Sequence, residues 1–168
     1  MKRVFLIGGG TGGHCIPMSV VYMQAPKRYE CHIITDERGK KYFKDIEPKN
    51  IIIIKNLISS QSTLSNIINA PFLFIQSLWH YLSIRPHVSL GFGGFFTIPV
   101  LFSGLVLNKK VFIHEGNAFI GKANRFLVKF IGKILTTFRE TQGLKRNHNI
   151  KLLRVGLPIR VSQNSINK

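Results

Sequence analysis

Short apolar runs alternate with longer amphipathic stretches along almost the whole of this 168-residue chain. The runs are rich in Ile, Val and Leu and are bounded by glycine, proline or charge, which is typical of strands buried on both faces of a sheet. They predict strands at residues 3–8, 31–35, 50–55, 87–91, 109–114, 133–138 and 150–155. Helical spacing of apolar residues predicts helices at residues 16–25, 38–46, 63–84, 95–107 and 120–131.

Strands that alternate with helices indicate βαβ units. The sequence therefore predicts an α/β fold, a Rossmann-like parallel sheet with helices on both faces. We expect residues 1–160 to form one domain and residues 161–168 to form a polar tail. Because sheets of this kind bind ligands at the carboxyl ends of their strands, candidate chemistry is expected in the loops that follow the strands.

The densest glycine loop follows the first predicted strand, where residues 8–14 read Gly-Gly-Gly-Thr-Gly-Gly-His. Glycines let a backbone approach a ligand closely, and the start of a following helix favours an anion such as a phosphate or sugar diphosphate. His14 then places a titratable imidazole beside that anion.

The same loop allows a second interpretation. Gly8, Gly10 and Gly13 match G-x-G-x-x-G, and Asp36 lies near the position of the ribose-binding acid of dinucleotide-binding domains. An enzyme that uses a nicotinamide or flavin therefore stays open at this point, as does a tight turn without a ligand.

Two further loops are expected on the same edge of the sheet. One contains Gly93 and Gly94, and the other reads His114-Glu115-Gly116-Asn117. The pair His114 and Glu115 is a candidate base with its orienting group, although Glu115 could equally pair with a nearby cation. Asn117 suits either sugar hydroxyls or the cap of the following helix. Further along, Arg160 follows a rigid turn and could contact a phosphate, the alternative being an ordinary surface arginine.

The formal net charge is +17, from 24 Lys and Arg against 7 Asp and Glu. Such a surface attracts nucleic acid, anionic lipid or phosphorylated substrates. We expect no nucleic-acid partner, because the chain lacks a recognition motif for one. The two cysteines, Cys15 and Cys31, have the spacing of neither a disulfide framework nor a metal site, so no metal is expected.

The segment at residues 67–84 is apolar but interrupted by polar residues, so it is expected to lie on a membrane rather than to cross one. Its aromatic residues and a basic helical face further along predict a surface for anionic lipid headgroups. An ordinary amphipathic core helix is the other interpretation of the basic segment. The residues of the expected membrane surface are Phe72, Phe74, Trp79, Lys122, Arg125 and Lys129.

Taken together, these motifs resemble the N-terminal domain of the MurG family of peptidoglycan glycosyltransferases. Residues 9–14, followed by Pro17, resemble the family's first glycine loop, and residues 91–94 its second. Residues 114–117 resemble its His-Glu-Gln-Asn stretch, and residues 156–160 its Gly-Asn-Pro-Val-Arg stretch. The four motifs occur in the family's order.

The resemblance implies the N-terminal half of a GT-B fold. It also implies an inverting, metal-independent transfer of GlcNAc from UDP-GlcNAc to the MurNAc 4-hydroxyl of lipid I (undecaprenyl-diphospho-MurNAc-pentapeptide), which gives lipid II. The implied location is peripheral, on the cytoplasmic face of the bacterial inner membrane, and no cofactor is implied. The general base would be His14. The donor-binding residues would be Thr11, Gly12, Gly13, Asn117 and Arg160. The acceptor-binding residues would be Gly9, Gly10, Gly93, Gly94, His114 and Glu115.

Some positions depart from the family. Gly116 stands where the family usually has Gln, Leu157 where it has Asn, and the loop at residues 37–41 lacks its usual glutamate. The family continues into a second domain that holds most of the donor, and the resemblance covers only the first. We therefore expect half of a split enzyme that works with a separate C-terminal-domain chain. The alternative is a non-catalytic, membrane-docking, acceptor-binding subunit or a decayed fragment.

Overall fold

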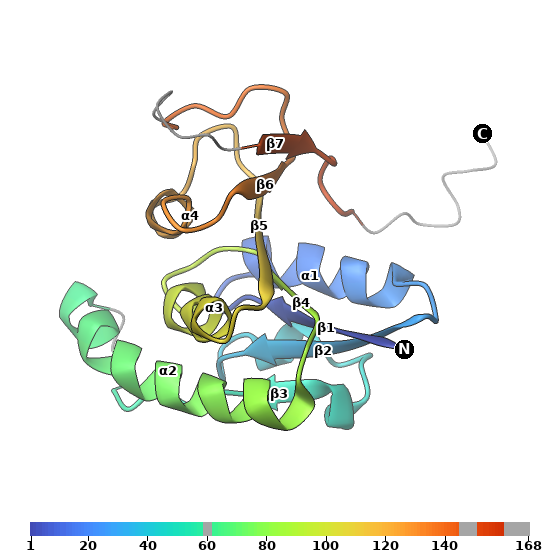
Figure 1. The fold of residues 1–168 in the computed structure, drawn as a ribbon, viewed down its shortest axis with the longest axis vertical. Coiled ribbons are helices and arrows are strands. Elements are labelled where there is room, and N and C mark those ends of the chain that lie inside the picture. The colour runs from blue at the N-terminus through green and yellow to red at the C-terminus, as the bar shows by residue number, and fades with distance from the viewer. Residues whose placement is uncertain (59–61, 145–150, 160–168) are drawn as a thin grey trace.

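A computed structural model describes residues 1–58, 62–144 and 151–159. The described chain forms one parallel sheet with the strand order β3-β2-β1-β4-β5-β6-β7 (Figure 1). The strands are β1 (Lys2–Ile7), β2 (Tyr29–Thr35), β3 (Ile51–Ile53), β4 (Val88–Gly91), β5 (Lys110–Glu115), β6 (Lys133–Thr136) and β7 (Lys151–Arg154). The helices are α1 (Gly12–Gln24), α2 (Thr63–Ile84), α3 (Thr97–Val106) and α4 (Lys122–Leu127).

The sheet is covered by helices on both faces, as the sequence predicts. Side chains of a strand alternate between its two faces, and the central strand β1 shows this directly. Phe5 and Ile7 pack into a core shared with α2, α3 and α4. Leu6 packs on the other face, with Cys15 and Met18 of α1. The predicted α/β fold with a Rossmann-like parallel sheet is confirmed, and the strand order brings the carboxyl ends of β1, β4 and β5 side by side.

The long helix α2 lies across the sheet with one side buried and the other exposed. It buries Leu73 and Tyr81 in the core, whereas Ile75 and Trp79 are exposed. The Tyr81 hydroxyl donates a hydrogen bond of 2.7 Å to Ser89 Oγ, which ties α2 to β4. In the described part of the chain, no helix has the length and apolar character needed to cross a membrane.

Several predicted elements have different limits. The predicted helix at residues 38–46 is wrong, because only a 3-10 turn forms at Lys40–Tyr42. Phe43 and Ile46 reach the core beside α1 from an irregular loop. Their spacing is the same as that of apolar residues on one face of a helix, which explains the wrong prediction. The predicted strand at residues 50–55 shortens to β3, and the predicted helix at residues 120–131 shortens to α4.

The first helix begins four residues earlier than predicted, at Gly12 instead of residue 16. The basic helical face expected at residues 122–133 is also shorter than predicted, because Lys133 belongs to β6. Residue 150 of the last predicted strand, together with Arg160 and the predicted tail at residues 161–168, lies outside the described residues.

The bond between Tyr81 and Ser89 is buried, so its loss should be measurable. We expect Tyr81→Phe to lower the free energy of unfolding by about 1–2 kcal/mol, because a buried Ser89 hydroxyl loses its partner. The double variant Tyr81→Phe/Ser89→Ala should lose less than the sum of the two single variants. Urea denaturation of the four proteins measures this coupling, and strictly additive losses would contradict it.

Candidate active site

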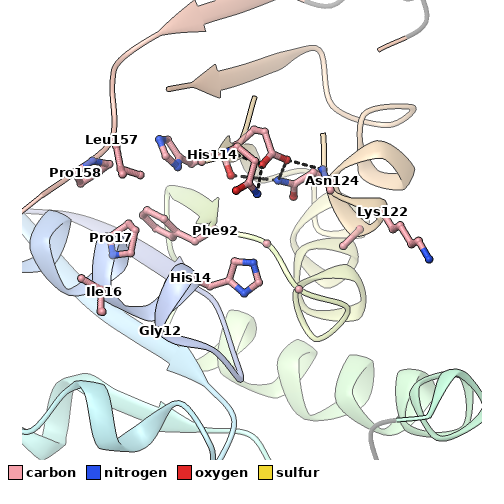
Figure 2. A pocket seen from close by; sticks show the side chains of 18 of the residues that line it. Gly12, His14, Ile16, Pro17, Phe92, His114, Lys122, Asn124, Leu157 and Pro158 are labelled. Atoms are coloured by element: carbon pink, nitrogen blue, oxygen red, sulfur yellow. Dashed lines mark hydrogen bonds between the residues drawn. The ribbon is translucent and has the colours of Figure 1, made fainter. Parts of the chain in front are cut away.

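A cavity of about 720 Å³ opens at the carboxyl ends of β1, β4 and β5. It is lined by the helix start after the first glycine loop, by the second glycine loop, by the loop after β5 and by the segment after β7. Figure 2 shows that His14, Phe92 and His114 line this same cavity from three different elements. The three loops predicted to share one edge of the sheet therefore meet there.

His14 lies in the first turn of α1, with Thr11 as the N-cap residue. Its Nδ1 is 3.1 Å from Thr11 Oγ1 and 3.4 Å from the carbonyl oxygen of Gly9. Because a carbonyl only accepts, we assign the ring hydrogen to Nδ1, which leaves the Nε2 lone pair free. The first loop thus orients an imidazole that can accept a proton at Nε2.

The second glycine loop packs directly against this imidazole. Gly93 has a φ of 106° and Gly94 a φ of 89°, conformations that favour glycine. A Cβ atom on Gly93 would lie 3.0 Å from both Cδ2 and Nε2 of His14. Glycine at this position therefore both permits the turn and leaves room beside the free nitrogen of His14.

The N-terminal end of α1 also faces the cavity. Gly12 and Gly13 line it, and among the described residues their backbone N–H groups have no acceptor. The first N–H groups of a helix and its positive dipole end favour an anion, so this side of the cavity suits a phosphate. Lys122, which the sequence places on the expected membrane surface, also belongs to the lining, and Figure 2 shows its side chain directed away from His14.

Glu115 organises the loop after β5. Its carboxylate accepts hydrogen bonds of 2.9–3.0 Å from the backbone N–H groups of Asn117 and Gly121 and from the side-chain amides of Asn117 and Asn124. It is only 2% exposed. Among the described residues, Glu115 thus pairs with N–H groups of its own loop and of α4 and not with a Lys or Arg side chain. Asn117 does not cap α4, whose N-cap residue is Gly121.

His114 lies behind Phe92, with ring centroids 5.7 Å apart. Its Nε2 donates to the carbonyl oxygen of Gly156, 3.1 Å away, and so holds the segment after β7 against the site. Burial lowers the pKa of His114 from its ordinary value, although the Gly156 carbonyl and the Glu115 carboxylate oppose this shift. The hydrogen bond to Gly156 gives His114 a structural role, since it links β5 to the segment after β7.

Asp36 has a structural role that the sequence did not indicate. Its carboxylate accepts hydrogen bonds from the backbone N–H groups of Gly10 and Gly39 and from the Arg38 guanidinium. The side chain is 1% exposed, so it is committed to the glycine loop and not presented to a ribose. The Asp36 position therefore gives no support to a dinucleotide site.

Most residues predicted for the site do meet in this cavity. The predicted residues that line it are Gly12, Gly13, His14, Gly93, Gly94, His114, Glu115 and Asn117. Thr11 is hydrogen-bonded to His14, which lines the cavity. Gly9 lines a neighbouring groove, and Gly10 lies against Arg38. Arg160 lies outside the described residues.

Some cavity residues are not indicated by the sequence. Ile16 and Asn124 line the cavity without a motif of their own, and Phe92 lies in the second glycine loop but is not predicted as a site residue. The two departures from the family pattern, Gly116 and Leu157, are neighbours, since a Cβ on Gly116 would lie 3.7 Å from Leu157 Cδ1. Across the described ranges, no group of three His, Cys, Asp or Glu residues is placed to hold a metal ion.

This fold and site define a Rossmann-like domain of the glycosyltransferase class. Residues 4–136 match the glycosyltransferase family 28 N-terminal domain, and the chain belongs to this family. The match confirms the resemblance that the sequence motifs carry.

Curated relatives and solved structures agree with this assignment. The chain is 32% identical over 161 residues to the UDP-N-acetylglucosamine–N-acetylmuramyl-(pentapeptide) pyrophosphoryl-undecaprenol N-acetylglucosamine transferase of Rickettsia rickettsii, covering 95% of this chain and 43% of the relative. The same-named protein of Rickettsia bellii is 35% identical, with 86% and 40% covered. The chain thus spans about two fifths of these relatives' length. MurG of Acinetobacter baumannii shares the fold, with a TM-score of 0.70, 19% identity, and 92% of this chain and 45% of that one covered.

The contact between Gly93 and His14 yields a test of the site geometry. We expect Gly93→Ala to lower the free energy of unfolding by about 1–3 kcal/mol, because alanine is strained at this φ. In the folded fraction, the added methyl group should displace the imidazole and shift the NMR signals of the His14 ring. Gly132→Ala is the matched control, since its Cβ meets no atom within 4 Å. Unchanged His14 signals in folded Gly93→Ala protein would contradict the packing.

Proposed function

We propose that this chain supplies the acceptor site and the general base for transfer of GlcNAc from UDP-GlcNAc to the MurNAc 4-hydroxyl of lipid I. The observation that carries the proposal is the free Nε2 of His14, held at the cavity between two glycine loops. The names of the Rickettsia relatives, which state both the sugar donor and the pyrophosphoryl-undecaprenol acceptor, support the choice of substrates.

In the proposed reaction, Nε2 of His14 takes the proton of the MurNAc 4-hydroxyl as its oxygen attacks the anomeric carbon of GlcNAc. The bond from that carbon to the UDP phosphate breaks, and its electron pair leaves with UDP. Attack opposite the leaving group inverts the anomeric centre. A positioned base of this kind contributes on the order of 10²–10⁴-fold to the rate.

The anionic groups of both substrates have counterparts in the cavity. The N–H groups of Gly12 and Gly13 suit the diphosphate of the donor, without a metal in the proposal. Thr11, Asn117 and Arg160 are proposed donor contacts as well. The proposed acceptor contacts are Gly9, Gly10, Gly93, Gly94, His114 and Glu115, of which Glu115 acts by shaping its loop.

Since the chain spans about two fifths of its relatives, we propose that a polypeptide equivalent to their remaining part completes the cleft. We expect transfer of labelled GlcNAc to a lipid I analogue only after the C-terminal half of the Rickettsia rickettsii relative is added. In that mixture, His14→Ala should lower the rate by roughly 10²–10⁴-fold, since the base is removed. His87→Asn is the control, because His87 is exposed and its ring accepts a hydrogen bond from the backbone N–H of Arg3, outside the cavity.

Each outcome of this assay decides one part of the proposal. Turnover by the chain alone would contradict the need for a second half. Unchanged turnover in His14→Ala would contradict the base. Acceptor binding without turnover in any mixture would favour a non-catalytic acceptor-binding subunit.

We also propose that the chain binds peripherally to the cytoplasmic face of the inner membrane. The exposed side of α2 carries apolar residues at helical spacing, and α4 and the turn after it add Phe126 and Phe130 beside three cations. Ile67 of α2 and Phe126 of α4 line one groove, so the two helices border the same surface. The exposed apolar residues of this membrane surface are Leu64, Ile67, Ile68, Phe72, Ile75, Trp79, Leu82, Phe126 and Phe130. Its exposed cations are Lys122, Arg125 and Lys129, whereas the predicted Phe74 is half-buried.

Vesicle flotation tests this surface. We expect the chain to float with vesicles rich in phosphatidylglycerol at low salt and not with pure phosphatidylcholine. Arg125→Gln/Lys129→Gln should weaken binding roughly thirtyfold, since each cation near the lipid contributes about 1 kcal/mol. Trp79→Ser should weaken it further, whereas Lys27→Gln/Arg28→Gln, at the opposite edge of the sheet, should have no specific effect. Equal losses in both double variants would show non-specific attraction and contradict the surface.

A further inference from the structure

A second hollow of about 420 Å³ lies next to the candidate active site, and we call it the α2–α3 groove. It runs between the first half of α2, the loop and start of α3, and one residue of α4. Most of its lining residues are apolar, among them Ile67, Ala70, Leu73, Phe95, Ile98 and Phe126. The side chains of Arg38, Asn56 and Asn66 add polar groups to the walls.

The groove joins the active-site cavity at the second glycine loop. Gly94 and Phe95 line both hollows. A Cβ on Gly94 would lie only 3.5 Å from Nδ1 of His14, so the groove comes within one residue of the proposed base. Its other walls reach Ile67 and Phe126, which are 64% and 43% exposed and belong to the membrane surface. The groove thus connects that surface with the active site.

One cation, Arg38, lines the groove together with Asn56 and Asn66. The Arg38 guanidinium lies against Gly10, whose Cβ would be 2.7 Å from Nη2. Its Nε and Nη2 donate to the buried Asp36, at 2.9 and 2.6 Å, which fixes the plane of the guanidinium. Among the described residues Nη1 has no acceptor, and the side chain is 43% exposed. An anion can therefore bind Arg38 without displacing its existing bonds.

An apolar channel with a fixed guanidinium beside the first glycine loop complements an apolar chain that carries a diphosphate. We propose that the α2–α3 groove binds the first isoprene units of a prenyl diphosphate, with Arg38 contacting the phosphate next to the chain. This assignment rests on the proposed function. The groove assignment adds to that function a path for the acceptor from the membrane surface to His14. It also makes Arg38 and Ala70 determinants of acceptor binding.

The proposal separates tail recognition from phosphate recognition, so two soluble ligands test it. Farnesyl diphosphate and isopentenyl diphosphate carry the same diphosphate on prenyl chains of different length. We expect the chain to bind farnesyl diphosphate at least tenfold more tightly in isothermal titration, below the ligand's micellar concentration and without UDP-GlcNAc. Ala70→Phe, which fills the groove, should abolish this difference and leave the affinity for isopentenyl diphosphate unchanged.

The charge is tested in the same titration. Arg38→Gln should weaken both ligands by roughly tenfold, the loss expected for a charged hydrogen bond. Arg38→Lys keeps a cation against Asp36 and should retain most of the affinity, which separates loss of charge from loss of folding. The matched controls are Ser83→Phe, which adds the same bulk at an exposed position near the end of α2, and Arg28→Gln, which removes a charge at the opposite edge of the sheet.

The outcomes distinguish this proposal from the proposed function. Equal affinities of the two ligands for the unaltered chain would overturn the groove assignment, and so would a persistent preference for farnesyl diphosphate in Ala70→Phe. Equal losses in Arg38→Gln and Arg28→Gln would overturn the role of Arg38. If the dependence on chain length holds while sugar transfer fails, the groove assignment stands and the transfer proposal falls. If sugar is transferred but ligand affinity does not depend on chain length, the transfer proposal stands and the groove assignment falls.

Discussion

Loops at the carboxyl edge of a parallel sheet carry backbone N–H groups that no neighbouring strand can pair, and buried acceptors must satisfy them. Asp36 accepts from Gly10 and Gly39, and Glu115 accepts from Asn117 and Gly121. Of the seven acidic residues, these two are buried. The shape of the site therefore depends on two carboxylates that take no part in the proposed chemistry. N–H donors surround both carboxylates, and this allows their burial in a chain that is otherwise strongly basic.

The sequence predicts the framework well, because burial of β-branched runs and the apolar spacing of α2 are local signals. It fails at residues 38–46, where Phe43 and Ile46 reach the core from a loop fixed by Asp36. That bond spans only three residues and forms a turn, but the apolar spacing of Phe43 and Ile46 favours a helix in the sequence. The early start of α1 has a related cause, since glycine has low helix propensity and Gly12 gives no signal of a helix start.

The candidate site was predicted by its residue types but not by their roles. Glycine density, His14 and the strand-end rule place the right loops together. The roles depend on the hydrogen bonds that each side chain makes: Glu115 accepts bonds from the loop after β5, and His114 donates one to the Gly156 carbonyl. These assignments follow from contacts between residues far apart in the sequence, such as Gly93 against His14. Spacing along one chain cannot supply them.

Different elements wall the two hollows. The active-site cavity receives the polar ends of α1 and β5, with helix N–H groups, an imidazole and a carboxylate network. The α2–α3 groove receives the apolar sides of α2 and α3, with Arg38 as its fixed charge. They meet at Gly94, whose φ of 89° favours glycine and whose Cβ would lie 3.5 Å from the His14 ring and 3.6 Å from the Gly9 carbonyl oxygen. In the proposed acceptor path, a glycine at this junction keeps the cavity and the groove continuous. An acceptor with a sugar at one end and a lipid at the other requires this continuity.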